Sequence, residues 1–197
     1  MKKISAILTL SLLIFAFGAC SNFKPNTVSV AELTERENAI FSTTSEKSFV
    51  FDFKIDREYE EVSVWIEKYE LGELVDDKLV HLTTEVEQNG SIIFTVPRTN
   101  NLKQNNFNIG VSSSGGTSSI SGFDSDSTGL AEMSSVWGSF QEMITIEGGE
   151  VVLADICYSN ENVMSTLSMS FYEDVESNMS ELEEYNVAYL LKAEFIN

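Results

Sequence analysis

The acidic run over residues 124–129, DSDSTG, has the spacing of a calcium-binding loop. Oxygen-bearing side chains fall at positions one, three, five and nine of such a loop: Asp124, Asp126, Thr128 and Glu132. Calcium prefers hard oxygen ligands, and Gly129 at position six permits the sharp turn that the loop needs. Position twelve, where a bidentate Glu belongs, is Ser135, and the flanks do not predict paired helices. The run predicts either a weak calcium site or a flexible, acidic, Ser-rich loop.

A row of aromatic and acidic residues gives a second candidate site. In the strand over residues 62–69, Val62, Val64 and Ile66 are expected on one face, and Trp65, Glu67 and Tyr69 on the other. A Trp/Tyr row beside a carboxylate can stack on sugars or pack against a peptide. The row therefore predicts a ligand platform, unless a loop or a second layer of structure covers it.

The groups that enzymes use for catalysis are scarce. His81 is the only histidine, and the G-x-S-x-G motif that could supply a nucleophile to a Ser-His-Asp triad is absent. One histidine cannot supply a zinc site, which takes several His or Cys ligands. Two of the 31 Asp and Glu residues could cleave a glycoside, but so many carboxylates form pairs by chance. We therefore predict no catalytic residue.

The segments that must position these residues read as strands, because apolar and polar residues alternate with period two. Strands are predicted over residues 49–55, 61–69, 73–87, 92–96, 107–111, 142–146, 151–158, 163–171 and 187–195. Turns are predicted at residues 70–73, and hairpins at Asn89-Gly90 and Gly148-Gly149. Residues 112–129 predict a long surface loop with at most one short strand near Ile120. Residues 173–185 predict an acidic segment with a helical turn.

Eight to ten strands joined by hairpin signals predict an all-β protein, a single antiparallel β-sandwich over residues 48–197. A closed barrel is the second choice. The polar residues before this domain predict a tether over residues 20–47. Within that tether, Ser29 and Glu32 have capping-box spacing, which predicts a short helix over residues 30–40.

Residues 1–20 have the order of a secretory signal peptide. Lys2 and Lys3 precede an apolar run over residues 4–17, and the small residues Gly18 and Ala19 follow it. A helical membrane span needs roughly 20 apolar residues, so this run is too short and favours a cleaved signal. One interpretation of this order is an ordinary secretory signal in which Cys20 has no role.

The sequence Phe17-Gly18-Ala19-Cys20 resembles the lipobox of bacterial lipoproteins, although most members have Leu where Phe17 stands. The resemblance implies signal cleavage between Ala19 and Cys20 and a diacylglyceryl group on the sulfur of Cys20. Two acyl chains are enough for stable anchoring, so the protein is expected on the extracytoplasmic face of a bacterial membrane. The segment over residues 65–72, WIEKYELG, loosely resembles small lipoproteins of low-GC Gram-positive bacteria, which favours a Gram-positive cell membrane. This resemblance implies no catalytic residues.

Charge and cysteine content limit the possible partners. Cleavage before Cys20 leaves 178 residues, with ten basic and 31 acidic side chains and a net charge of −21. Such a charge argues against nucleic acid and against anionic lipid head groups as partners. If Cys20 is acylated, Cys157 has no disulfide partner, and its apolar surroundings predict a small buried core residue.

Three hypotheses for function remain, and a purely structural envelope protein stays open beside them. The first is a lipid-anchored, non-catalytic binding module for an envelope protein or glycan. The second is a calcium-assisted carbohydrate-binding module, and the third is an envelope hydrolase. Apart from weak calcium, no cofactor is expected.

Overall fold

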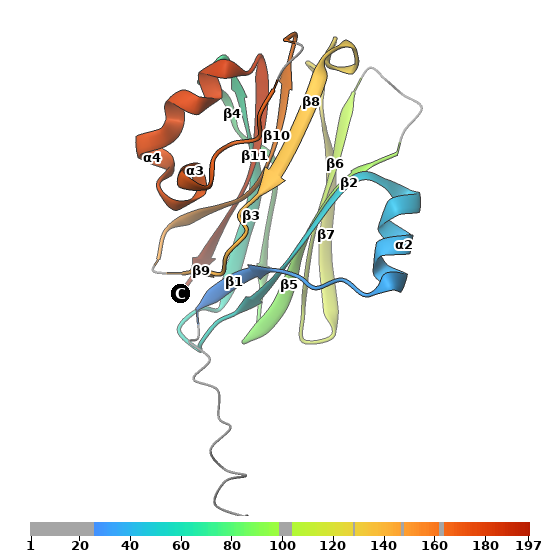
Figure 1. The fold of residues 1–197 in the computed structure, drawn as a ribbon. Coiled ribbons are helices and arrows are strands. Elements are labelled where there is room, and N and C mark those ends of the chain that lie inside the picture. The colour runs from blue at the N-terminus through green and yellow to red at the C-terminus, as the bar shows by residue number, and fades with distance from the viewer. Residues whose placement is uncertain (1–25, 99–103, 128, 147, 162–163) are drawn as a thin grey trace, which may run out of the picture.

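The computed structural model describes residues 26–98, 104–127, 129–146, 148–161 and 164–197. Two antiparallel sheets pack face to face and form a β-sandwich (Figure 1). The predicted all-β sandwich is therefore confirmed. Among the described residues, no helix is both long enough and apolar enough to cross a membrane.

Each sheet combines strands from distant parts of the chain. Sheet A has the order β7 (Gly116–Asp124), β6 (Asn105–Ser113), β5 (Asn89–Pro97), β2 (Ser45–Lys54), β1 (Thr27–Val30) and β9 (Ile144–Thr145). Sheet B has the order β4 (Glu73–Glu85), β3 (Glu61–Glu70), β11 (Val187–Ile196), β10 (Glu150–Ser159) and β8 (Ser134–Ser139).

The alternating phenylalanines of β2 form the centre of the core. Phe51 and Phe53 are buried and point toward sheet B. The Phe51 ring stacks on Phe140 with centroids 5.3 Å apart, and Phe53 meets Phe195 edge-on at 5.4 Å. This alternation is the pattern that predicted β2, because successive side chains of a strand point to opposite faces.

The two long sides of the sandwich differ. On one side β4 and β7 meet: the Thr84 and Ser118 hydroxyl oxygens are 2.8 Å apart, and a Cβ on Gly122 would lie 2.6 Å from Val80. On the other side sheet B ends at β8 and sheet A ends at β1 and β9. We call these the closed side and the open side.

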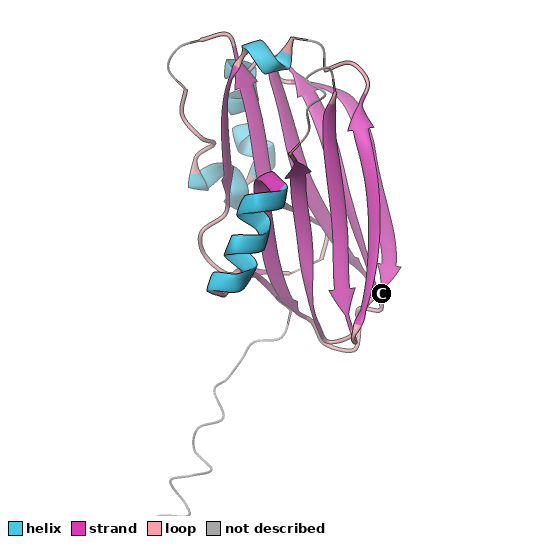
Figure 2. Ribbon diagram, turned by 90° about the vertical axis from the view of Figure 1, so that its right-hand side faces the viewer, coloured by secondary structure: helices cyan, strands magenta, loops and turns pink. Residues whose placement is uncertain are grey.

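Helices lie outside the two sheets (Figures 1 and 2). The helix α2 (Glu35–Thr44) lies beside sheet A, whereas α3 (Met169–Glu173) and α4 (Val175–Asn178) lie against the outer face of sheet B. Two short 3-10 segments, η1 (Leu130–Glu132) and η2 (Met179–Glu184), complete the helical part. The acidic segment predicted to contain a helical turn is thus confirmed as helical.

The helix α2 begins later than the predicted helix over residues 30–40. Its capping box is formed by Thr34, which accepts from the Glu37 backbone, and by Glu37, which accepts from the Thr34 backbone. The Ser29 of the predicted box lies instead in β1, opposite Asp52. The sequence pattern therefore predicted a capping box here but assigned it to the wrong pair of residues.

The folded domain also begins earlier than the predicted boundary at residue 48. Residues 27–30 form β1 and pair with β2, and residues 35–44 form α2. The strand β1 has only four residues, the shortest run in which a period-two pattern is used, and the polar composition of the surrounding segment concealed it. Any tether is limited to the part of residues 20–47 that precedes β1.

Two predicted hairpins are absent from the structure. Asn89 and Gly90 begin β5, which lies in the other sheet from β4, and the chain likewise changes sheets between β9 and β10. Gly90 is required for packing rather than for a turn, because a Cβ there would lie 2.3 Å from the Phe53 ring and from the Ser112 carbonyl oxygen. In contrast, the predicted turn between β3 and β4 is confirmed, with positive φ at Leu71 and Gly72.

Other local predictions were wrong as well. The stretch over residues 112–129, predicted as a loop with at most a short strand near Ile120, contains the nine-residue strand β7, which pairs along its whole length with β6. In place of the strand predicted over residues 163–171, the described residues 164–168 have no regular secondary structure and lead into α3. The strand β8 was not predicted, because its sequence SSVWGS has little of the β-branched and aromatic character of strands.

Candidate functional site

The first predicted metal ligand, Asp124, has a protein partner. It ends β7 with its side chain inside the sandwich, where its Oδ2 accepts a 2.7 Å hydrogen bond from the Tyr189 hydroxyl. The same oxygen lies 2.9 Å from the Lys68 ammonium, and both side chains are at least 95% buried. Oδ1 accepts from the Asp126 backbone at 2.8 Å. The carboxylate that was predicted to bind calcium is thus paired with an ammonium group.

The charges in this cluster stabilise each other. Burial opposes ionisation of Asp124, but the hydrogen bonds from Tyr189 and Lys68 outweigh it and lower the carboxyl pKa below its usual 3.8. Burial likewise opposes the charge of Lys68, but Glu70 at 2.9 Å and Asp124 raise the pKa of the ammonium above 10.5. The arrangement is a structural ion pair.

The other predicted calcium ligands are not gathered around Asp124. Asp126 and Glu132 are exposed, and Thr128 lies outside the described residues. Within the described ranges, no group of three or more His, Cys, Asp or Glu could hold a metal ion. The structure therefore gives the calcium hypothesis no support at Asp124.

The predicted ligand platform is covered. Trp65, Glu67 and Tyr69 are 3%, 6% and 5% exposed. Glu67 accepts hydrogen bonds from Tyr69 at 2.6 Å and from Trp65 at 3.3 Å, and the Lys192 ammonium lies 3.1 Å from it. Burial and the bond to Glu67 raise the pKa of the Tyr69 hydroxyl. These side chains form a satisfied buried network, so they do not offer a surface for stacking.

The single histidine has hydroxyl partners. His81 Nε2 lies 2.7 Å from the Ser63 Oγ and 3.2 Å from the Thr83 Oγ1. Burial, and then the charge of Lys78, lower the pKa of the imidazole. No carboxylate of the described residues is hydrogen-bonded to His81, so the arrangement does not form the triad that an activated serine needs.

A second polar group lies under α3. Asp155 is fully buried and accepts hydrogen bonds from the Tyr172 hydroxyl and, at 3.5 Å, from the Cys157 thiol. Burial raises the pKa of the Asp155 carboxyl, and burial with the nearby Asp155 raises the pKa of the Cys157 thiol. The prediction that Cys157 is a buried core residue is confirmed.

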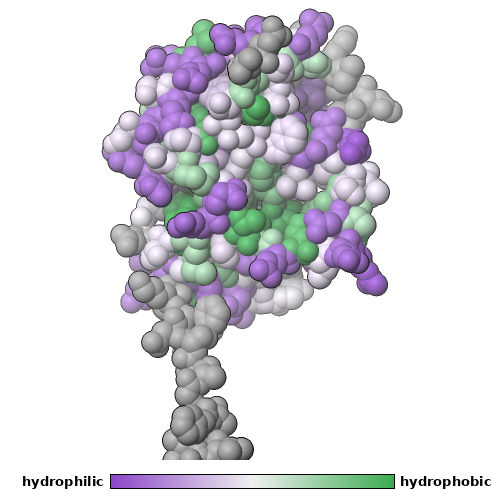
Figure 3. Space-filling view, in the orientation of Figure 1, coloured by the Kyte–Doolittle hydropathy of each residue, from purple (hydrophilic) through white to green (hydrophobic). Residues whose placement is uncertain are grey.

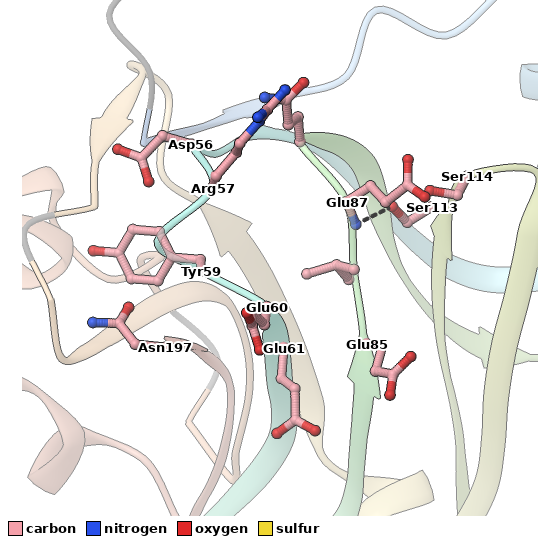
Figure 4. Close-up of a pocket in the computed structure, with 12 residues that line it drawn as sticks. Asp56, Arg57, Tyr59, Glu60, Glu61, Glu85, Glu87, Ser113, Ser114 and Asn197 are labelled. Carbon is pink, nitrogen blue, oxygen red and sulfur yellow. Dashed lines mark hydrogen bonds between the residues drawn. The ribbon is translucent and has the colours of Figure 1, made fainter.

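A hollow of about 950 Å³ lies at the end of the sandwich near Asp56 and Asn197 (Figure 4). Five of its lining residues are acidic and one, Arg57, is basic; the acidic ones are Asp56, Glu60, Glu61, Glu85 and Glu87. Figure 4 shows Asp56, Glu61 and Glu87 pointing in different directions rather than toward one centre. The hollow is an acidic surface depression without convergent ligands.

The open side carries a different kind of group. Lys47, on β2, is only 8% exposed, and its ammonium lies 4.8 Å from the centre of the Trp137 ring and 5.8 Å from that of Tyr158. Trp137, on β8, is 48% exposed. Burial lowers the pKa of the Lys47 ammonium, while Glu46 opposes the shift. A buried cation next to an exposed aromatic ring is the arrangement on this molecule most suited to binding.

Neither Lys47 nor Trp137 was singled out from the sequence. The alternation of Phe49, Phe51 and Phe53 continues backwards to Lys47, so its inward direction could have been predicted. Its proximity to Trp137 depends on the pairing of distant strands and has no local signal.

An apolar groove of about 390 Å³ lies close to α3, between that helix and the segment after β8. Phe140, Met143, Ile144, Met169 and Tyr172 line it, and Met143 and Met169 are 59% and 43% exposed. Figure 3 shows apolar surface on the lower half of this face of the molecule. Trp137 lies on β8, the edge strand of sheet B, and the groove is lined by the segment that follows β8.

The predicted lipidation site, Ala19-Cys20, lies outside the described residues. No curated protein and no solved structure matches the chain. A family model does match, and its extent agrees with the structural finding that β1 is part of the domain. The model of the YgaN domain covers residues 27–195, and the chain therefore belongs to this family.

Proposed function

We propose that the protein is an extracytoplasmic lipoprotein whose β-sandwich is a non-catalytic binding module at the bacterial cell envelope. The extracytoplasmic location is supported by residues 1–20, in which a basic start, a short apolar run and small residues precede Cys20. The resemblance of residues 17–20 to a lipobox supports acylation of Cys20. A Gram-positive cell membrane is the favoured location.

Chain geometry limits how far the domain can stand from the membrane. Asn26 and Asp56 hydrogen-bond to each other at the end of the sandwich that holds the acidic hollow. Asn26 is six positions after Cys20. A fully extended chain over six residue steps spans at most about 20 Å. The acidic end would therefore face the membrane, and Trp137 would lie on a flank of the domain.

The observation that carries the binding role is the half-exposed Trp137 on the open side. Large aromatic side chains dominate interface energetics, and tryptophan is enriched among the residues that contribute most to binding. The groups with catalytic potential are used differently: His81 bonds to hydroxyls, and Asp155 is inaccessible. These features favour binding over hydrolysis.

Fractionation of cells that produce the full chain tests the anchor. We expect the wild-type protein in the membrane fraction, and Cys20→Ala to accumulate in the medium or as the unprocessed precursor. Cys20→Ala that is processed and retained like the wild type would show that acylation is not the anchor.

Site-specific photocrosslinking on intact cells tests the binding role. A photoreactive phenylalanine analogue replaces Trp137 in one variant and Leu74 in the other, because these residues are 48% and 51% exposed. We expect an envelope adduct at position 137 and none at the control position on β4. Equal labelling at the two positions, or none at either, would contradict a binding role for the open side.

A further inference from the structure

Only two lysines among the described residues are less than a tenth exposed, and they lie in one row across the sandwich. Lys68 pairs with Asp124, which accepts from Tyr189. The Tyr189 ring meets Tyr158 edge-on at 6.1 Å, and Tyr158 in turn lies beside Lys47. The row runs from the closed side, at Lys68, to the open side, at Lys47.

The two ammonium groups are stabilised in different ways. Lys68 has two carboxylates at 2.9 Å and a backbone carbonyl at 3.2 Å. The contacts of Lys47 in the described part of the chain are the faces of Trp137 and Tyr158. Burying a charge is costly unless it is paired and hydrogen-bonded, and a ring face offsets only part of that cost. Lys47 is therefore able to accept an anionic partner that Lys68 cannot.

We propose that Lys47 and Trp137 form a binding site for an anionic sugar, with its carboxylate or phosphate on the ammonium and its ring against the indole. This assignment rests on the proposed binding function and names the class of ligand. A sugar ring presents C–H groups to an aromatic face, and Trp137 has nearly half of its surface available for such a contact.

The strand β8 also supplies hydrogen-bonding groups. Ser135 and Ser139 are two residues on either side of Trp137 and therefore share its face of the strand. Both are only partly buried, so their hydroxyls can donate to and accept from sugar hydroxyls. The Trp137 ring, the Lys47 ammonium and these two hydroxyls together match the chemistry of a charged monosaccharide.

The charge of the whole molecule selects a small anion over a large one. The net charge is −19, and Lys192 is the only basic residue after Gln104. Such a field repels long polyanions and acidic proteins, whereas one anionic group faces the local attraction of Lys47. We therefore favour a glycan unit over an acidic protein segment.

Fluorescence titration of the mature lipoprotein in detergent tests the site, because its two tryptophans differ: Trp65 is buried and Trp137 is half exposed. The probes are glucuronate, glucose 6-phosphate, glucose and inorganic phosphate. We expect saturable changes with at least one of the anionic sugars, at least tenfold tighter than with glucose or with phosphate alone.

A lysine variant at each tryptophan provides the matched comparison. Lys47→Met should weaken binding of the anionic sugar at least tenfold. Lys78→Met should leave binding unchanged, although the exposed Lys78 also lies over a tryptophan, 5.8 Å from the centre of the Trp65 ring. If Lys47→Met does not fold, Lys47→Gln makes the same comparison with a neutral polar side chain.

Each outcome has a distinct meaning. Binding of glucuronate alone supports a carboxylate sugar, binding of glucose 6-phosphate alone a phosphorylated one, and binding of both the shared chemistry. Equal binding of glucose, equal binding of phosphate alone, or unchanged binding by Lys47→Met would overturn the assignment. If none of the probes binds but envelope adducts form at position 137, the anionic-sugar site is wrong and the binding function stands. If all the envelope adducts at position 137 are proteins, the sugar site is wrong and the binding function stands.

Discussion

Lys68 and Lys47 are both buried, but among the described residues only Lys68 lies within ion-pair distance of a carboxylate. Lys68 faces β7 on the closed side, where Asp124 meets it at 2.9 Å. Lys47 faces β8 on the open side, where the opposing groups are aromatic rings. The difference separates a lysine that stabilises the fold from one whose charge is available to a ligand.

Removing the carboxylate partner should have the largest effect. Asp124→Ala leaves the Lys68 ammonium with Glu70 as its single carboxylate partner among the described residues and leaves the Tyr189 hydroxyl without its acceptor. Breaking a buried ion pair costs about 3–5 kcal/mol, and urea unfolding monitored by circular dichroism measures this loss. Asp126→Ala, in an exposed neighbour, is the control and should change the stability by no more than about 0.5 kcal/mol. Equal losses in the two variants would remove the basis for calling Lys68 structural.

A smaller effect is expected from opening the contact between β4 and β7. Gly122→Ala places a Cβ 2.6 Å from a Val80 methyl group, so one of the two strands must shift. Overpacking of this kind costs about 1–3 kcal/mol.

Gly116→Ala is the matched control on the same strand, since a Cβ there lies 3.7 Å from its nearest neighbour. We expect a change of no more than about 0.5 kcal/mol in the free energy of unfolding. If Gly122→Ala is as stable as Gly116→Ala, the closed side is not tightly packed.

Replacing Lys47 should change the free energy of unfolding in the opposite direction. Lys47→Met removes a buried charge and keeps an apolar chain of similar length. We expect between no change and a gain of about 1 kcal/mol in the free energy of unfolding, because the loss of the ring contacts offsets part of the gain. Lys68→Met in the same assay should lose stability, because it leaves Asp124 buried without its cation. A comparable loss in both variants would contradict the proposed difference.

The two lysines should also respond oppositely to alkaline pH. Lys47 has a folded-state pKa below 10.5, so between that pKa and 10.5 the unfolded chain binds more protons and the Lys47 contribution to stability rises with pH. Lys68 has a folded-state pKa above 10.5, so its contribution is complete below 10.5 and is lost as the pH rises through the folded-state value.

The same linkage applies to Asp124 in acid. Its lowered pKa gives stability that is present above 3.8 and lost as the pH falls through the folded-state value. Unfolding curves of the wild type, Lys47→Met and Asp124→Ala across both ranges give each contribution by difference. If the stabilities of the wild type and of Lys47→Met change in parallel with pH in the alkaline range, burial does not lower the pKa of Lys47.

The sequence predicted those parts of the fold that depend on local pattern. The alternating Phe49, Phe51 and Phe53 identified β2, and Leu71-Gly72 identified the turn between β3 and β4. The length of the edge strand β7 was underestimated, as a short strand near Ile120 at most, because backbone pairing with β6 stabilises β7 without an apolar pattern. The hairpin predicted at Asn89-Gly90 failed because the chain changes sheets there, which depends on the pairing of distant strands.

The site was less predictable than the fold. Asp124 and Trp65 were recognised as chemically capable residues, but the sequence could not show that Lys68 pairs with one and that neighbouring groups bury the other. Lys47 lies next to Trp137 only because β2 and β8 face each other across the open side. Contacts between sheets have no signature within either strand.

The difference between the two lysines is tested most directly by their titration in the folded protein. Carbon-13 methyl labels on the lysines of the mature lipoprotein, assigned with Lys47→Arg and Lys68→Arg, report each pKa by NMR. We predict that Lys47 titrates below 10.5 and Lys68 above it, and that a saturating anionic sugar raises the pKa of Lys47 alone. Lys47 titrating at or above the pKa of Lys68 would contradict the distinction between a structural and an available cation.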